Sequence, residues 1–138
     1  MPEDPGPEAA ARLVAAAGKA AAYAYAPYSK FHVGAALLFD DGSVVTGCNV
    51  ENVSYGLTSC AERNALFRAI SESGPNRKIV AIAVANSNGR PSPPCGACRQ
   101  VLSEFAVPDA MIYFPGDHGL ESRPLKELLP FQFHLDPN

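Results

Sequence analysis

The spacing of hydrophobic and polar residues predicts a series of short strands separated by helices and turns. Apolar runs bounded by Gly, Pro, Asn or Asp are typical of strands in a buried sheet. The dipeptide Asp41-Gly42 favours a tight turn and therefore predicts a hairpin between two of these runs. Strands are expected over residues 31–40, 43–48, 79–85 and 110–114, with a short fifth strand after Gly119.

Helices are expected between and around these strands. Alanine is the strongest helix former and dominates the segment before Pro27. Ser59 precedes Glu62 by three residues, a spacing that favours a capping box at the start of a second helix. Helices are therefore expected over residues 7–25, 59–71 and 95–105, with a last short turn between 124 and 130. Strands that alternate with helices favour a layered α/β fold.

The size and composition of the chain fit one compact domain. Its 138 residues are a usual length for a single domain, and a composition of 47% hydrophobic and 18% charged residues excludes a disordered chain. Residues 1–7 are rich in proline, glycine and acidic groups. We expect them to form a flexible N-terminal tail, followed by a single catalytic domain over residues 8–138.

The charge and hydropathy of the chain indicate which kinds of molecule it can bind. The formal net charge is −3 and the sequence holds no run of Lys or Arg, whereas nucleic-acid binders usually carry a basic patch. A small or neutral substrate is therefore expected, and no nucleic acid. The alanine-rich stretch 9–26 is a poor membrane span because Arg12, Gly18 and Lys19 interrupt it. The acidic, proline-rich start differs from a secretory leader, which predicts a cytoplasmic protein with no membrane association.

Two short motifs carry the candidate chemistry. The first is Cys60-Ala61-Glu62, and the second is Pro94-Cys95-Gly96-Ala97-Cys98. Cysteines in a cytoplasmic chain are more often metal ligands or catalytic groups than disulfides. Three thiolates can hold Zn²⁺ and leave its fourth tetrahedral position to water, and the nearby carboxylate can move protons for that water. The motifs therefore predict a catalytic zinc site with Glu62 as its acid and base.

The predicted positions of these motifs support thiolate formation. Both stand at expected helix starts, where unpaired N–H groups and the helix dipole lower the pKa of a thiol. We expect Arg63 to donate a hydrogen bond to a ligand sulfur and so to offset the charge of three thiolates. An exposed arginine without such a contact is the alternative. Likewise, Glu62 has an alternative role as the capping-box carboxylate.

Cys48 leaves a second type of metal site open. As a fourth ligand it would close the site, which would then only stabilise the fold. An isolated cysteine at the end of a strand is more often a small buried hydrophobic residue. A closed site also gives Glu62 no purpose, so we favour three ligands.

The chain as a whole resembles the small homotetrameric cytidine deaminases from about residue 10 onward. The resemblance is carried by residues 25–31, 33–37, 47–52, 60–63, 94–101 and 127–130, followed by Phe133. It implies a three-layer α/β/α sandwich around a five-stranded mixed sheet, with one zinc ion per subunit. It also implies hydrolytic deamination of cytidine and 2′-deoxycytidine to uridine and 2′-deoxyuridine, with release of ammonia, as in pyrimidine salvage.

The resemblance also implies roles for individual residues. Asn49 and Glu51 would bind the sugar hydroxyls, Phe31 would pack against the pyrimidine, and the Ala61 N–H would bind its O2 carbonyl. Tyr55 and Phe133 would reach the site of a neighbouring subunit, with Phe131 as a second candidate for the stacking residue. Each of these residues also has a plain structural role available: loop solubility, strand core or anchoring of the chain end.

Three other functions remain possible at this point. One is deamination of another aminopyrimidine, such as a nucleoside antibiotic of the blasticidin type. The second is a zinc module that only binds a partner, and the third is editing of nucleic acid. Cys60 stands where the relatives that act on tRNA or single-stranded DNA resemble His-x-Glu, which favours a free nucleoside. The sequence does not decide between ribose and deoxyribose.

Overall fold

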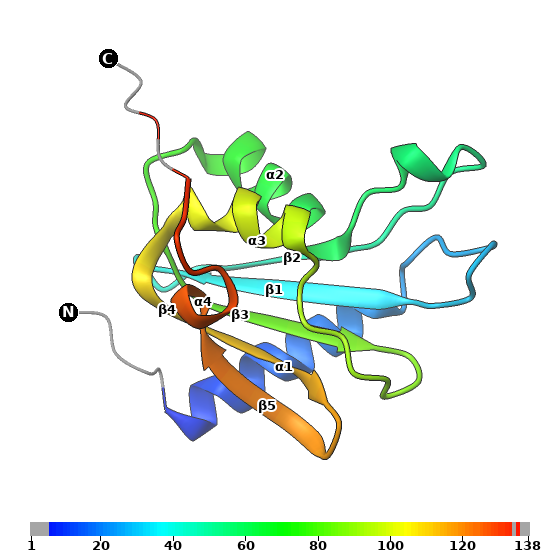
Figure 1. Ribbon diagram of the computed structural model, residues 1–138, viewed down its shortest axis with the longest axis horizontal. Coiled ribbons are helices and arrows are strands. Elements are labelled where there is room, and N and C mark those ends of the chain that lie inside the picture. Colours follow the sequence, from blue (N-terminus) through cyan, green and yellow to red (C-terminus); the bar gives the residue numbers. More distant parts are fainter. Residues whose placement is uncertain (1–5, 134, 136–138) are drawn as a thin grey trace.

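A five-stranded mixed sheet forms the centre of the computed structural model, which describes residues 6–133 and 135 (Figure 1). The strand order is β2-β1-β3-β4-β5. Only the central pair β3 and β4 is parallel, and the other neighbours are antiparallel. The strands are β1 (Val33–Phe39), β2 (Val44–Cys48), β3 (Ile79–Asn86), β4 (Ala106–Gly116) and β5 (Gly119–Pro124). The expected mixed five-stranded sheet is confirmed.

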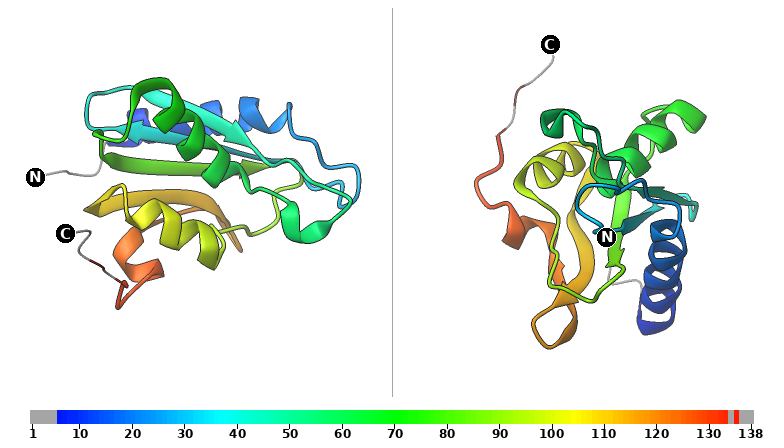
Figure 2. Two further views of the ribbon diagram at one scale, coloured as in Figure 1. Left: turned by 90° about the horizontal axis from the view of Figure 1, so that it is seen from above. Right: turned by 90° about the vertical axis from the view of Figure 1, so that its right-hand side faces the viewer.

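Helices cover both faces of the sheet and complete three layers (Figure 2). Helix α1 packs on one face through Leu13 and Ala17, which contact alanines of β1 and β3. Helices α2 and α3 pack on the other face through residues such as Leu66 and Leu102. The helices are α1 (Pro7–Ala21), η1 (Tyr55–Leu57), α2 (Ala61–Ser73), α3 (Gly96–Ser103) and α4 (Leu125–Leu128). No helix in the described residues has the length and hydropathy needed to cross a membrane.

Helix α2 lies unusually close to β2, and this fixes the position of its first turn. A Cβ atom added at Gly47 would lie 2.7 Å from the carbonyl oxygen of Ala61 and 2.8 Å from the Cα of Ala65. Real side chains do not approach backbone atoms so closely, so glycine is required where this helix crosses the strand. Any larger residue at Gly47 would push the Cys60-Ala61-Glu62 motif away from the sheet.

Two element boundaries differ from the sequence prediction by four residues, and the others differ by at most two. Helix α1 ends at Ala21 rather than Tyr25, because Tyr25 pairs with the segment around Val50. The Tyr25 N–H donates to the Asn49 carbonyl at 3.0 Å, and the Tyr25 carbonyl accepts from the Glu51 N–H at 2.8 Å. Strand β4 starts at Ala106 rather than Ala110. An irregularity in its pairing with β3 accommodates the extra residues, including a proline, which cannot donate to a ladder.

The residues described begin just before the first helix. The expected N-terminal tail, residues 1–7, overlaps α1 at Pro7, and residues 1–5 lie outside the described part of the chain. The division into a tail and one domain therefore stays a prediction.

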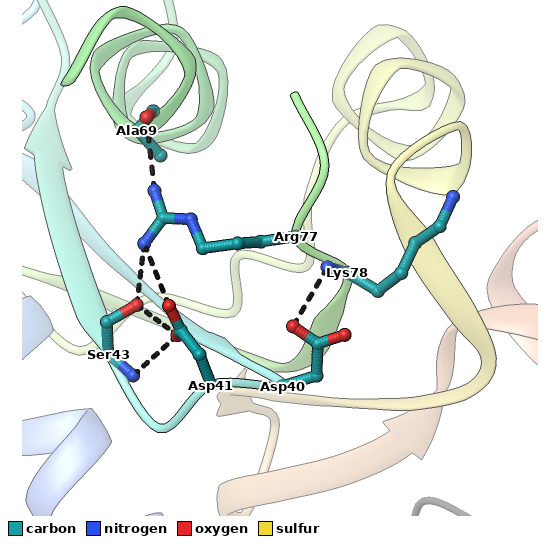
Figure 3. Close-up of polar contacts among 6 residues, drawn as sticks. All are labelled: Asp40, Asp41, Ser43, Ala69, Arg77 and Lys78. Atoms are coloured by element: carbon teal, nitrogen blue, oxygen red, sulfur yellow. Dashed lines mark hydrogen bonds and ion pairs between the residues drawn. The ribbon is translucent and has the colours of Figure 1, made fainter. Parts of the chain in front are cut away.

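Arg77 connects the C-terminal half of α2 to the β1–β2 hairpin (Figure 3). Its Nη2 donates to the carbonyl oxygen of Ala69 at 3.1 Å, and its Nη1 donates to Ser43 Oγ at 2.6 Å, with Asp41 Oδ2 at 3.9 Å. The guanidinium also lies 4.3 Å from the centre of the Phe39 ring. Since its side chain is only 15% exposed, these contacts are largely shielded from water.

Replacing Arg77 by methionine is expected to lower the free energy of unfolding by about 2 kcal/mol, because charge-assisted hydrogen bonds and a cation–π contact are lost together. Lys78→Met is the matched control, since the neighbouring Lys78 is exposed and contributes its backbone N–H to Asp40. It should change stability by less than about 0.5 kcal/mol. Urea denaturation of both variants measures the difference, and equal losses would contradict this role for Arg77.

Candidate metal centre and cavity

Three cysteine sulfurs meet where the N-termini of α2 and α3 converge. Cys60 and Cys95 are the N-cap residues of these two helices, and Cys98 lies in the first turn of α3. The three sulfurs lie within 4.8 Å of one another, with 3.9 Å between those of Cys60 and Cys95. Cys95 Sγ also accepts a hydrogen bond from the Cys98 N–H at 3.5 Å. We call this group the cysteine cluster.

The geometry of the cysteine cluster fits a tetrahedral zinc ion. Ligand sulfurs about 2.3 Å from Zn²⁺ lie about 3.8 Å apart in a tetrahedral site, close to the 3.9 Å between Cys60 and Cys95. All three cysteines are free of disulfides. Cys48 is also a free cysteine but is not part of the cluster, so the described residues give no support to a closed four-cysteine site.

Hydrogen bonds and a nearby positive charge favour the thiolate form of Cys60. The hydrogen bond from Cys98, together with one from Arg63, lowers the pKa of Cys60 to about 5. Arg63 Nη2 donates to Cys60 Sγ at 3.4 Å, which is the contact expected from the sequence. The pKa of Cys98 is raised instead, because its thiol hydrogen-bonds to the Cys60 thiolate and because it is buried. A bound dication would supply the positive charge that lets all three sulfurs be thiolates.

Glu62 lies in the first turn of α2 and is only 5% exposed. Burial raises the pKa of its carboxyl group to about 7, and the nearby Cys60 thiolate also raises it. The predicted capping box is absent, since the N-cap is Cys60 and no side chain caps this helix. Ser59 Oγ instead contacts Asn64 Oδ1 at 2.5 Å. The Glu62 carboxylate is therefore not held by Ser59.

The buried Glu62 predicts an unusual dependence of stability on pH in chelator-treated protein. Because its pKa rises from about 4.5 to about 7 on folding, the folded state holds this proton more tightly than the unfolded state. Its contribution to stability is therefore present at low pH and falls as pH rises from about 4.5 to 7, by about 3 kcal/mol in total. Denaturation at several pH values should show this loss in the wild type relative to Glu62→Gln. A constant difference between the two proteins across that range would contradict it.

A small cavity of about 210 Å³ opens beside the cluster and Glu62. Its wall combines apolar side chains with several polar groups. It is lined by Phe31, Val33, Asn49, Thr58, Cys60, Ala61, Glu62, Val84, Ser92, Pro93 and Cys95. Four residues that the sequence analysis expected at the site line this cavity, namely Phe31, Asn49, Ala61 and Glu62. Glu51, which was expected beside Asn49, does not line it.

Asn49 and Glu51 are both buried and held by the segment before β1. Asn49 Oδ1 accepts from the Val33 N–H and its Nδ2 donates to the Phe31 carbonyl, both at 2.9 Å. Glu51 Oε1 accepts from the backbone N–H groups of Tyr28 and Ser29, and its Oε2 accepts from the Ser29 hydroxyl. The Ser29 hydroxyl bond lowers the pKa of Glu51 most, so this carboxylate is ionised. Glu51 lines a separate, larger groove of about 830 Å³.

The aromatic residues expected to reach a neighbouring site lie on the surface of this chain. Tyr55 is 68% exposed, and its ring packs edge-on against Tyr28 with 6.0 Å between ring centres. Phe133 is 73% exposed and Phe131 is fully exposed. None of the three lines the small cavity of its own chain.

Several cavity residues were missed in the sequence. Thr58 stands two residues before Cys60, and Ser92 and Pro93 come just before the second motif. Their nearness to the ligands was a usable signal. Nothing in the sequence distinguishes Val33 and Val84 from other apolar residues in the core of a strand.

A comparison with models of known protein families shows which family this chain belongs to. Residues 7–114 match the family model described as "Cytidine and deoxycytidylate deaminase zinc-binding region". The chain belongs to this family. Its cysteine cluster supplies the donors for the zinc ion that the description of the family names.

Similar proteins come from several bacteria. A cytidine deaminase of Halalkalibacterium halodurans is 55% identical over 80% of this chain and 83% of its own. One from Mycobacterium tuberculosis is 52% identical over 87% of this chain and 86% of its own. Among solved structures, cytidine deaminase from Burkholderia pseudomallei aligns with a TM-score of 0.81 at 45% identity, over 89% of this chain and 98% of its own. This deaminase-family chain therefore matches nearly the whole length of its relatives.

Proposed function

We propose that this protein catalyses the hydrolytic deamination of cytidine and 2′-deoxycytidine to uridine and 2′-deoxyuridine, with release of ammonia. The observation that carries the proposal is a buried carboxylate, Glu62, beside three convergent cysteine sulfurs at one small cavity. The cavity is smaller than the roughly 300–1,000 Å³ of drug-sized sites, which favours a ligand no larger than a nucleoside base in this part of the site.

Cys60, Cys95 and Cys98 would hold the zinc ion, which when bound would supply Lewis acidity to activate a water molecule near neutral pH. Arg63 draws charge from the Cys60 sulfur and so preserves that acidity. The Ala61 N–H belongs to the first turn of α2, where backbone N–H groups have no partner within the helix, and it can bind the O2 carbonyl of the ring.

Glu62 moves the protons of the reaction. It accepts a proton from water as the oxygen forms a bond to C4, and it donates that proton to N3. It then takes the remaining proton from the new hydroxyl group and transfers it to the amino group, which leaves as ammonia when the C4–N bond breaks. One water is consumed and C4 gains a carbonyl. A pKa near 7 suits a group that must act as base and then as acid.

The sugar and base contacts extend the proposal. Asn49 has one of its two amide N–H groups left after bonding to Phe31, and Glu51 keeps unused lone pairs, so both can bind sugar hydroxyls in fixed orientations. Phe31 supplies an apolar surface for the pyrimidine at the cavity wall.

We further propose a homotetramer in which Tyr55 and Phe133 enter a neighbouring subunit's site. Their high exposure supports a contact with another chain, because Leu57, 72% exposed, lies beside Tyr55 on η1, and exposed apolar side chains that lie close together are typical of interaction surfaces. The groove lined by Glu51 offers a surface for it. Light scattering during activity assays tests this, and a fully active monomer would contradict it.

Pyrimidine salvage in the cytoplasm is the proposed setting. Four free cysteines fit a reducing compartment, where thiolate ligands persist.

The decisive experiment is to add cytidine to the purified protein and to follow uridine formation. Activity should disappear after treatment with a zinc chelator and return with added zinc. A blasticidin-type antibiotic and single-stranded DNA containing cytosine serve as comparison substrates. Absence of uridine with zinc present, or a strong preference for either comparison substrate, would overturn the proposal.

A further inference from the structure

The hydroxyl group of Thr58 has no hydrogen-bond partner although it is buried. In the described part of the chain, three buried side-chain polar atoms lack a partner, namely Thr58 Oγ1, Arg63 Nε and Arg77 Nε. The two arginines use their other nitrogens in hydrogen bonds. Thr58 has no other side-chain polar atom to use. A buried hydroxyl without a partner is unfavourable, so a ligand that satisfies it is a physical explanation for its presence.

Thr58 lies at the small cavity and is held firmly there. It lines the cavity together with Asn49, Cys60 and Glu62. Its N–H donates to the Tyr55 carbonyl at 3.1 Å, which ends the short helix η1 and fixes the backbone at this point.

The local strand pairing places Thr58 relative to the metal ligand Cys60. Val50 and Ser59 exchange two backbone hydrogen bonds, of 3.0 and 2.9 Å, as an antiparallel pair. This register sets Cys60 across from Asn49 and Thr58 across from Glu51. Cys60, Asn49 and Thr58 line the small cavity, whereas Glu51 lines the larger groove. Thr58 therefore shares the small cavity with Asn49, and its backbone lies across from that of Glu51, the other residue proposed to bind the sugar.

The spacing along the chain indicates which part of the nucleoside Thr58 meets. Two residues in an extended segment span about 6.6 Å, so Thr58 lies about the width of a pyrimidine ring from Cys60. Since C4 of the base must face the metal, this distance brings the sugar end of the ligand near Thr58. A hydroxyl both donates and accepts, as a sugar hydroxyl does.

We propose that the Thr58 hydroxyl binds the 2′ or 3′ hydroxyl of the nucleoside sugar, beside Asn49. The proposal rests on the function proposed above, and it adds a binding residue that lies outside the two cysteine motifs.

Thr58→Val removes the hydroxyl at nearly constant shape and is expected to change stability and binding in opposite directions. The free protein should be as stable as the wild type or more so, because no partner within the chain is lost. The value of kcat/KM for cytidine should fall about 3- to 10-fold, mainly through KM, as expected for one neutral hydrogen bond. Thr58→Ser keeps the hydroxyl and should restore most of the loss.

A cytidine analogue without 2′ and 3′ hydroxyls separates binding from a purely structural effect. With 2′,3′-dideoxycytidine, the wild type and Thr58→Val should have the same kcat/KM, because the partner hydroxyl is absent from the ligand. Unchanged kcat/KM for cytidine in Thr58→Val, or an equal loss with both substrates, would overturn the inference. If the wild type itself fails to deaminate cytidine, the proposed function fails instead, so the two failures are distinguishable.

Discussion

Glu62→Gln is expected to reduce the turnover of cytidine by about 10²–10⁴-fold while leaving the fold and the zinc content unchanged. Glutamine has nearly the same shape and still hydrogen-bonds, but it neither accepts nor donates a proton in this pH range. The residue is buried at the cavity and belongs to no capping box, so its loss removes no helix cap. Only the transfer of protons between water, N3 and the leaving amine is lost.

Glu72→Gln provides the matched control for this experiment. Glu72 lies on the same helix, is exposed, and pairs with Arg68 at 3.1 Å on the surface. Surface ion pairs of this kind contribute little, so the control should keep full turnover. Steady-state kinetics and metal analysis on both variants decide the outcome. Substantial turnover in Glu62→Gln would exclude the proton-transfer role, and loss of zinc would show a structural role instead.

Cys98→Ala is expected to weaken zinc binding strongly and to abolish turnover. Cys98 is completely buried, and its sulfur lies within 4.8 Å of those of the other two cysteines. Loss of one thiolate should weaken zinc binding by about 10²-fold or more, given the total binding free energy that a few ligands share in zinc sites. Without the metal, water is not activated and cytidine is not converted.

Cys48→Ala tests whether Cys48 is a zinc ligand like the three cysteines of the cluster. Cys48 is half-buried at the end of β2, and burial raises the pKa of its thiol, which disfavours the thiolate that a metal needs. This variant should retain one zinc per chain and full activity. Zinc loss in Cys48→Ala, or an unchanged zinc affinity in Cys98→Ala, would contradict the three-cysteine assignment.

The element order could be predicted from the sequence because hydrophobic pattern and turn residues act locally. The Asp41-Gly42 turn and the apolar run that became β1 are examples. The end of α1 could not be predicted, since Tyr25 leaves the helix to pair with a segment about 25 residues away in sequence. The start of β4 was also missed, because Pro108 disfavours a strand except where a bulge accommodates it.

The sequence by itself determined which chemical groups are available. Three thiols and a carboxylate in two short motifs indicate a metal and a proton carrier, because residue type and helix-start position are local properties. Only the tertiary structure decided that the sulfurs of Cys60 and Cys95 lie 3.9 Å apart and that Glu62 is buried enough to raise its pKa to about 7. It also left the hydroxyl of Thr58 without a partner at the same cavity. Distance, burial and unmet hydrogen bonds depend on segments far apart in the chain, and no local pattern encodes them.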